Sequence, residues 1–460
     1  MDLRGCLACI PGLLLAGCAA FSPDGGVDGV NRIAAPHVGH AVPAQRGADA
    51  TEAIRRRTAE LLARELTADG AVELALLNQP ALRAGLAELG VAEADLVQAG
   101  RLPNPSLRFG RLGSSGHVEI DRSVLVDVLG LVTWPVTQRV EQQRYAAAQL
   151  RTAAGVVDAA AAARRAYVDA VAARMQLGYA EQVHDAADAA AELARRMEQA
   201  GNFSTLARLR EQAFVAQAGI ALEHARARDV AARERLGRAL GIDPAATGLR
   251  LPAALPPLPP SPIAAPAAEQ TAIDQRIDVR LATQSAAALA ESLGLTRATR
   301  LVNVLDAGYA NKSQTGQPRE DGYEIELMLP LFDFGETRVV RAEARYQAAL
   351  AQAADAALRA RAEVRIAYAG YRSAYAAAQR YRDDVVPLAQ AVSAENLLRY
   401  NAMQIGVFDL LADAREQIAS VSGAVDALRR YWRADADLQA ALAGPLSRAD
   451  RTDTDDGEMP

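Results

Sequence analysis

The chain has 460 residues, a net charge of −6 and 23% charged residues, without a basic stripe that would suit nucleic-acid binding. Half of the residues are hydrophobic, and more than a fifth are alanine, the strongest helix former. This composition favours a mainly α fold built from a few very long helices. Beyond the N-terminus, no run of about 18 uncharged apolar residues predicts a membrane-spanning helix.

The first 17 residues read as a secretory signal, with Arg4 followed by a short apolar run. The run ends in Leu15-Ala16-Gly17-Cys18, which resembles the lipobox of bacterial lipoproteins. Cleavage before Cys18 would leave this residue as the only cysteine, available for acylation and unable to form a disulfide within the chain. The alternative is an ordinary signal with an incidental cysteine.

Residues 18–50 are rich in glycine, proline and alanine and show no clear periodicity. We expect them to form a flexible, lipid-anchored tether. The first half of the remaining chain, residues 51–250, opens with an amphipathic helical pattern at 71–99. Two strand-like runs follow, at 105–111 and 118–132.

No proline occurs from Val136 to Asp243, and this stretch has one glycine-marked break at Gly201. It predicts a helical hairpin whose turn lies near Gly201. An arm covering 136–199 would reach roughly 95 Å at about 1.5 Å per residue.

Residues 251–267 form a proline-rich linker, which cannot be helical and reads as an extended connector. The second half, residues 268–445, repeats the plan of the first. A helix is expected at 268–297, and strands at 301–311 and 322–332.

The second half also predicts a helical hairpin, with its turn near Gly406. Pro387 is expected to kink its descending arm. The acidic segment 446–460 is expected to be a disordered tail.

An internal two-fold repeat supports this division. The segment Gln199-Ala200-Gly201-Asn202-Phe203 corresponds to Gln404-Ile405-Gly406-Val407-Phe408 at an offset of 205. Upstream, Arg144-Tyr145 corresponds to Arg345-Tyr346 at an offset of 201. The changed offset indicates a small insertion in the second half.

The second strand of each half alternates apolar and polar residues, so that each has one apolar face. The runs have about the 9–11 residues that a tilted strand needs to cross a bilayer. Four strands cannot close a barrel, and an open sheet edge is not tolerated in lipid, so a membrane role would require oligomerisation. The alternative is a small soluble sheet on a helical protein.

The lipobox, the repeat, the order of helix, two strands and helical hairpin, and the glycine turns together resemble the TolC family of outer-membrane factors. Further points of resemblance are Leu102-Pro103-Asn104-Pro105-Ser106-Leu107 and Leu329-Pro330-Leu331-Phe332-Asp333-Phe334-Gly335. The resemblance covers about 50–445. It implies a homotrimer with a twelve-stranded transmembrane β-barrel in the outer membrane, four strands from each chain, continued by an α-barrel tunnel across the periplasm.

The resemblance also implies partners and a role. The tunnel would dock on a periplasmic adaptor, or membrane fusion protein, which joins it to an inner-membrane pump, expected to be of the RND type. The chain would be a passive efflux duct in contact with outer-membrane lipid. It would not be an enzyme.

The resemblance also implies two groups of functional residues, by their positions relative to the two glycine turns. The tips of the hairpins would contact the adaptor, through Gly201, Asn202, Phe203, Gly406, Val407 and Phe408. A ring of aspartates would close the periplasmic end, for which Asp409 and Asp413 are the candidates. Arg208 stands where Asp413 would be expected in the first half, so a tie between Arg208 and Asp413 of neighbouring hairpins is an alternative.

The sequence holds no HExxH, paired CxxC, GxSxG or Walker motif. We therefore expect no catalytic residues, cofactor or metal site. Two other functions remain open: the exit channel of a type I protein secretion system, and a structural periplasmic coiled-coil lipoprotein. The cargo is undetermined, although the sequence favours the metal-associated branch of the family over the drug-efflux branch.

Overall fold

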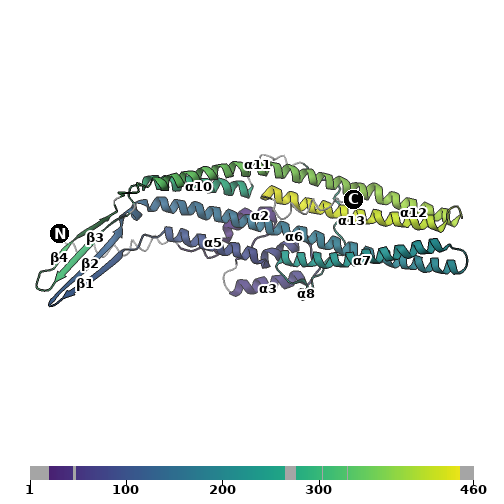
Figure 1. The fold of residues 1–460 in the computed structure, drawn as a ribbon, viewed down its shortest axis with the longest axis horizontal. Helices are drawn as coiled ribbons and strands as arrows, with labels where there is room; N and C mark the ends of the chain where they lie inside the picture. Colours follow the sequence, from purple (N-terminus) through teal and green to yellow (C-terminus); the bar gives the residue numbers. More distant parts are fainter. Residues whose placement is uncertain (1–19, 45–47, 265–275, 303, 329, 446–460) are drawn as a thin grey trace. The chain divides into compact units, whose positions relative to one another are not determined.

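The computed structural model describes residues 20–44, 48–264, 276–302, 304–328 and 330–445. Long helices dominate it, with a single four-stranded sheet (Figure 1). Within these residues, no helix combines the length and the apolar character needed to cross a membrane.

Two short helices lie in and after the segment expected to be a tether. They are α2 (Val27–Val38) and α3 (Ala48–Leu62), so the prediction of an extended tether over 18–50 was wrong for α2. The reason is a short apolar stripe, since Val27, Val30, Ala34 and Val38 are all buried.

The helix expected at 71–99 is divided in two, α4 (Ala68–Asn78) and α5 (Pro80–Ala99). The break falls at Pro80, which cannot donate a backbone hydrogen bond but suits the first turn of a new helix.

The hairpin helices are longer than expected. Helix α6 (Val128–Gln199) contains Pro135, and it begins inside the run 118–132 that was expected to be a strand. The start at Val128 has a local cause, because the Asp127 carboxylate accepts a hydrogen bond from the Gly130 backbone N–H at 2.7 Å. Helix α7 (Thr205–Leu240) returns from the turn, and the short α8 (Pro244–Thr247) follows.

In the second half, α10 (Ile277–Ala298) precedes the strands, and α11 (Glu336–Arg380) begins the hairpin. A π-helical turn, η1 (Tyr381–Val385), separates α11 from α12 (Val386–Asn401). Its wide turn is closed by a bond from the Val386 N–H to the Tyr381 carbonyl. Near Pro387, where a kink was expected, the helix instead changes to this π turn, which ends at Val385. Helix α13 (Val407–Ala443) completes the hairpin.

The strands are β1 (Ser106–Ser114), β2 (His117–Asp127), β3 (Leu305–Gln314) and β4 (Glu320–Leu327). They form one antiparallel sheet in the order β1-β2-β3-β4. The β1–β2 hairpin of the first half and the β3–β4 hairpin of the second half are joined by the pairing of β2 with β3. The expected fourth strand, 322–332, ends earlier, at Leu327.

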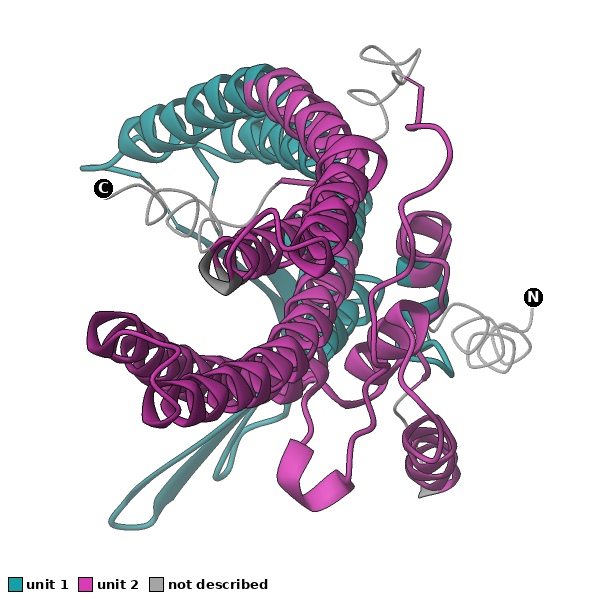
Figure 2. Ribbon diagram, turned by 90° about the vertical axis from the view of Figure 1, so that its right-hand side faces the viewer, with its two compact units in different colours: residues 1–30, 85–152, 277–358 teal, residues 31–84, 153–276, 359–460 magenta. Residues whose placement is uncertain are grey.

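The chain divides into two compact units, and neither unit coincides with one half of the sequence (Figure 2). The first unit comprises residues 1–30, 85–152 and 277–358 and includes the whole sheet. The second comprises residues 31–84, 153–276 and 359–460 and includes both hairpin turns.

In the second unit, the hairpin arms lie side by side, α6 with α7 and α12 with α13 (Figure 1). A buried stripe of small residues, including Ala160, Ala163 and Ala170, lets α6 pack closely against its neighbours. An aromatic cluster of Tyr371, Tyr375, Tyr431 and Trp432 forms a second packed region.

The proline-rich linker belongs to this second unit and forms neither helix nor strand from residue 251 to residue 264. Trp432 donates its indole N–H to the Pro256 carbonyl at 2.9 Å, and Tyr375 donates its hydroxyl to the Pro259 carbonyl at 3.1 Å. These bonds satisfy carbonyl groups that an extended segment cannot pair by itself.

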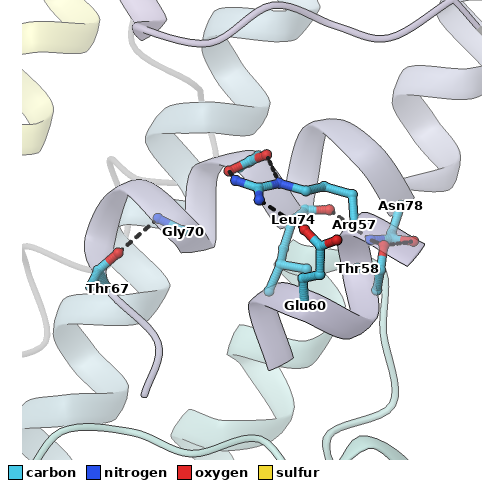
Figure 3. A network of polar contacts seen from close by, with 8 residues as sticks. Arg57, Thr58, Glu60, Thr67, Gly70, Leu74 and Asn78 are labelled. Carbon is cyan, nitrogen blue, oxygen red and sulfur yellow. Dashed lines mark hydrogen bonds and ion pairs between the residues drawn. The ribbon is translucent and has the colours of Figure 1, made fainter. Parts of the chain in front are cut away.

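A polar network joins α3 to α4 (Figure 3). Arg57 makes a two-pronged ion pair with Glu73, at 2.6 and 3.0 Å, and a third bond to Glu60 at 3.1 Å. Asn78 donates to the Thr58 hydroxyl at 3.0 Å, and Thr67 caps α4 by accepting from the Gly70 N–H.

The Arg57–Glu73 pair predicts a pH dependence. Hydrogen bonds from Arg57 hold the pKa of Glu73 below its ordinary range, against the opposing effect of burial. The unfolded chain has the ordinary pKa, about 4.3, so the pair stabilises the fold above that pH and the stabilisation is lost as the pH falls through the folded-state pKa. We expect Glu73→Gln to lower the free energy of unfolding at pH 7 by up to about 1 kcal/mol, measured by urea unfolding.

The difference between Glu73→Gln and the natural chain should shrink as the pH falls below about 4. Glu52→Gln is the control, because Glu52 is exposed and lies 3.9 Å from Arg55, too far for a strong bond. A difference that stayed constant down to the lowest pH would contradict the role of the carboxylate charge.

Candidate functional site

The four-stranded sheet has one apolar and one charged face. Residues paired across the strands share a face, and one face carries alternate residues of each strand: Leu107, Phe109, Val118, Ile120, Val124, Val126, Leu305, Ala307, Tyr309, Tyr323, Ile325 and Leu327. Many of these side chains are exposed, with Tyr323 at 85% and Leu107 at 77%. An exposed apolar face of this extent marks a surface that contacts lipid or protein.

The opposite face is charged. It carries Arg108 and Lys312 together with seven carboxylates: Glu119, Asp121, Asp127, Asp306, Glu320, Glu324 and Glu326. Both cations are ion-paired there. Lys312 binds Glu119, and Arg108 binds Glu324 at 2.7 Å and Glu326 at 3.3 Å.

The ion pairs of Arg108 indicate how the sheet is curved. Arg108 lies in β1 and its partners lie in β4, so the bonds cross β2 and β3. In a flat sheet, three strand spacings would separate the backbones of β1 and β4 by about 14 Å. The contact is readily made only when the sheet curves toward this face. The charged face is therefore concave, and the apolar face is convex.

The turn between α6 and α7 ends the first helix with a left-handed glycine. Gly201 has φ +77°, its N–H bonds to the Glu198 carbonyl, and the Asn202 N–H bonds to the Met197 carbonyl. This pattern is a Schellman motif. Ser204 then caps α7 by accepting a hydrogen bond from the Ala207 N–H at 3.2 Å.

The turn between α12 and α13 has the same hydrogen-bond pattern, displaced by three residues from the sequence match. Met403, with φ 60°, occupies the left-handed position, and its N–H bonds to the Tyr400 carbonyl. Gly406 has an extended backbone, φ −84° and ψ 165°, and stands at the cap of α13. Met403, and not Gly406, therefore supplies the left-handed residue of the second turn.

The predicted tip residues lie at these turns. Gly201, Asn202 and Gly406 are exposed, and Phe203 is half-buried. Val407 and Phe408 begin α13, but their side chains lie outside the described part of the chain. Met403, which the sequence did not single out, is 93% exposed and is the most prominent apolar side chain of the second turn.

The candidate gate residues occupy different surroundings. Asp409 is exposed, and its carboxylate accepts a hydrogen bond from the Gly406 N–H at 3.1 Å, so it caps its own helix. Asp413 is only 7% exposed, and its Oδ2 has no hydrogen-bond partner among the described residues. Arg208 binds Glu198, 2.6 Å away in its own hairpin. The described contacts within the chain include no tie between Arg208 and Asp413.

An ion pair near the turns was missed. Glu211 of α7 is 3% exposed and accepts a bond at 2.9 Å from Arg415 of α13, whose guanidinium also lies 4.4 Å from the ring centre of Phe214. This contact connects the two hairpins. Glu211 follows Gly201 by ten residues, and Asp413 follows Met403 by ten. The turns thus place two buried acids at equivalent positions, which an alignment on the two glycines conceals.

Arginines also precede both turns. Arg196 binds Glu192 at 2.8 Å, and Arg399 binds Glu395 at 3.0 Å, each within its own helix. Hydrogen bonds from Arg195 and Arg196 lower the pKa of Glu192 to about 2. These are exposed pairs on helix surfaces.

The predicted lipidation site, Cys18, lies outside the described residues, as do the signal segment 1–17 and the tail 446–460. In the part of the chain that is described, no group of three or more His, Cys, Asp or Glu side chains is arranged to hold a metal ion.

No protein-family model matches the sequence, and no curated protein is significantly similar to it. The fold, in contrast, matches solved outer-membrane channels. A membrane protein from Pseudomonas aeruginosa aligns with a TM-score of 0.70 and 20% identity, over 81% of this chain and 92% of that one. The outer-membrane protein VceC from Vibrio cholerae aligns with a TM-score of 0.69 and 17% identity, over 83% and 97%.

A third neighbour is CusC, whose structures concern its folding and transmembrane channel formation. It aligns with a TM-score of 0.69 and 18% identity, over 82% of this chain and 92% of that one. Together these likenesses show that the chain has the fold of TolC-family outer-membrane channels.

The geometry of the two turns predicts opposite responses to substitution. Gly201→Ala should destabilise the first turn by about 1 kcal/mol, because a side chain is strained at positive φ even where the space around it is open. Hydrogen–deuterium exchange of amides 197–203 should become about fivefold faster. Gly406→Ser is the matched variant and should leave exchange at the second turn unchanged or slower, since serine caps helices well.

Met403→Gly should slow exchange at the second turn, because it relieves the left-handed strain. Equal losses from Gly201→Ala and Gly406→Ser would contradict the different roles of the two glycines.

The ion pair between the hairpins predicts a larger effect. Arg415→Ala should lower the free energy of unfolding by about 2 kcal/mol, since it leaves the Glu211 carboxylate buried without its partner. Adding Glu211→Gln should recover most of this loss, in denaturant unfolding followed by circular dichroism. Arg210→Ala, which removes an exposed arginine beside Glu211, is the control. A double variant as unstable as Arg415→Ala would refute the account.

Proposed function

We propose that this chain is the outer-membrane channel subunit of a tripartite efflux system. It would act as a passive duct from a periplasmic adaptor and an inner-membrane pump to the outside. The observation that carries the proposal is the match of more than four fifths of the chain to outer-membrane channels.

The two-faced sheet supports this role. Three chains would contribute twelve strands and pair every open edge, which lipid requires. The convex apolar face would then contact lipid, and the concave charged face would line an aqueous lumen. The long hairpins would form the periplasmic tunnel, and the two halves of each chain would be structural repeats.

Anchoring and docking follow from the same arrangement. Residues 1–17 would direct secretion, and acylated Cys18 would hold the chain in the outer membrane. The tips around Gly201 and Gly406 would meet the adaptor, with Asn202, Phe203, Val407 and Phe408 beside them. Asp409 and Asp413 remain the proposed periplasmic gate. No reaction is proposed, because a duct requires no catalytic residues.

Bilayer recording of the purified, detergent-solubilised full chain tests the channel. We expect a heat-labile trimer on gels and discrete conductance steps in planar bilayers. A chain that stayed monomeric and gave no steps would exclude a duct and favour a structural periplasmic lipoprotein.

A deletion strain tests the cargo. Sensitivity to copper, silver, zinc or cobalt salts would indicate metal export, and sensitivity to dyes, detergents or antibiotics would indicate efflux of organic compounds. Loss of exported proteins without either sensitivity would favour a type I secretion channel.

A further inference from the structure

Among the described residues, the cationic side chains of the strands are ion-paired on one face of the sheet and make no ion pair on the other. On the concave face, Arg108 and Lys312 each bind carboxylates. On the convex face, Arg111 and Arg122 make no ion pair within the described residues. The only hydrogen bond found there for either guanidinium runs from Arg122 to the neutral side-chain oxygen of Asn311, at 3.1 Å.

Both arginines lie at the border of the apolar band. Along the convex face, the rows nearest the helices are apolar, and the last of them carries Tyr309 and Tyr323. Phe109 stands in the next row, whose other members are Arg122, Asn311 and Asp321. Phe109 pairs with Arg122, and Arg111 follows Phe109 by two residues, closer to the turn between β1 and β2. Aromatic residues mark the level of the lipid headgroups in transmembrane sheets.

The register brings the two guanidinium groups within reach of one ligand. Arg111 pairs with Ile120, so Arg122 is its diagonal neighbour across β1 and β2, at about 7–8 Å between Cα atoms. Arg111 is exposed and Arg122 is half-buried. Two long, flexible side chains at this separation can grip a single phosphate group from both sides.

The acidic residue of this border is already engaged. The carboxylate of Asp321 accepts bonds from the Tyr309 hydroxyl and from the Asn311 amide, the latter at 2.7 Å. Its charge also interacts with that of Arg319. Asn311 lies between Arg122 and Asp321, accepting a hydrogen bond from the first and donating one to the second. Within the described residues, Asp321 makes no direct ion pair with Arg111 or Arg122.

We propose that Arg111 and Arg122 bind a phosphate group of an anionic lipid in the outer leaflet. This inference rests on the proposed function, which orients the apolar face of the sheet toward lipid. It also orients the β1–β2 and β3–β4 turns away from the periplasm. The ligand class follows from the chemistry: a planar, fixed cation at the headgroup level attracts a lipid phosphate, while its methylene stem lies along the apolar band.

The test uses the full-length trimer in uncharged maltoside micelles, titrated with bisphosphorylated lipid A. Retained lipid is counted by native mass spectrometry at low salt. A basic residue near a charged membrane surface contributes about a fivefold gain in affinity, so R111Q/R122Q should weaken lipid A binding about 30-fold. The matched control is R108Q, which removes an arginine of the same strand from the concave face and should leave the affinity unchanged.

Two further ligands identify the source of the phosphate. Dephosphorylated lipid A should bind the natural chain about as weakly as lipid A binds R111Q/R122Q. Inorganic phosphate should not compete at equal concentration. Equal affinity of the natural chain and R111Q/R122Q for lipid A, an equal loss in R108Q, or effective competition by inorganic phosphate would each overturn the proposal.

The same preparations separate this inference from the proposed function. Bilayer conductance of the natural chain tests the duct, and it does not depend on the lipid titration. If the trimer conducts but R111Q/R122Q binds lipid A with the same affinity as the natural chain, the lipid site is refuted and the proposed function is not. A chain without conductance would remove the duct on which the site rests.

Discussion

The edges of the sheet impose the constraint on which the other features depend. Within the described residues, β1 and β4 each pair on one side only, so the outer side of each carries backbone N–H and C=O groups without a strand partner. Such edges are tolerated in water but not in lipid. The curvature toward the charged face brings the two edges toward one side, as a segment of a closed cylinder requires. The pairing of β2 with β3 in turn requires both halves of the chain.

The distribution of charge agrees with this geometry. A concave surface gathers its side chains, so cations there find carboxylates even across four strands, as Arg108 does. A convex surface spreads its side chains apart, and Arg111 and Arg122 remain without ion pairs among the described residues. The same curvature that suits strand closure thus separates a surface whose cations are paired with carboxylates from one whose cations make no ion pair among the described residues.

Sequence patterns predicted most of the elements and fewer of their ends. Period-two alternation located the apolar face of β2 and β4 correctly, because successive side chains of a strand point to opposite faces of the sheet. The start of α6 at Val128 was missed, since it depends on a single capping carboxylate, Asp127, inside an apolar run. The helix α2 was missed because its stripe of four small apolar residues is too short to stand out from its surroundings.

The turns were predicted in position but not in detail. Matching Gly201 with Gly406 is reasonable on sequence identity, yet backbone hydrogen bonds match Gly201 with Met403. Glycine can serve as a left-handed residue or as a helix cap, and sequence does not separate these uses. The Glu211–Arg415 pair could not be foreseen either, because it depends on which helix faces pack together.

The π-helical turn at Tyr381–Val385 has a consequence for the phase of the second hairpin. From Tyr167 to Gly201 the chain advances 34 residues, and from the corresponding Tyr368 to Met403 it advances 35. Five residues wound as a π turn cover about the same rotation as four in an α-helix. The additional residue is thus absorbed without turning the rest of the arm. Residues before and after the π turn therefore face the same directions around the helix axis as their counterparts in the first hairpin. The sequence offset between the two hairpins nevertheless increases by one residue at the π turn.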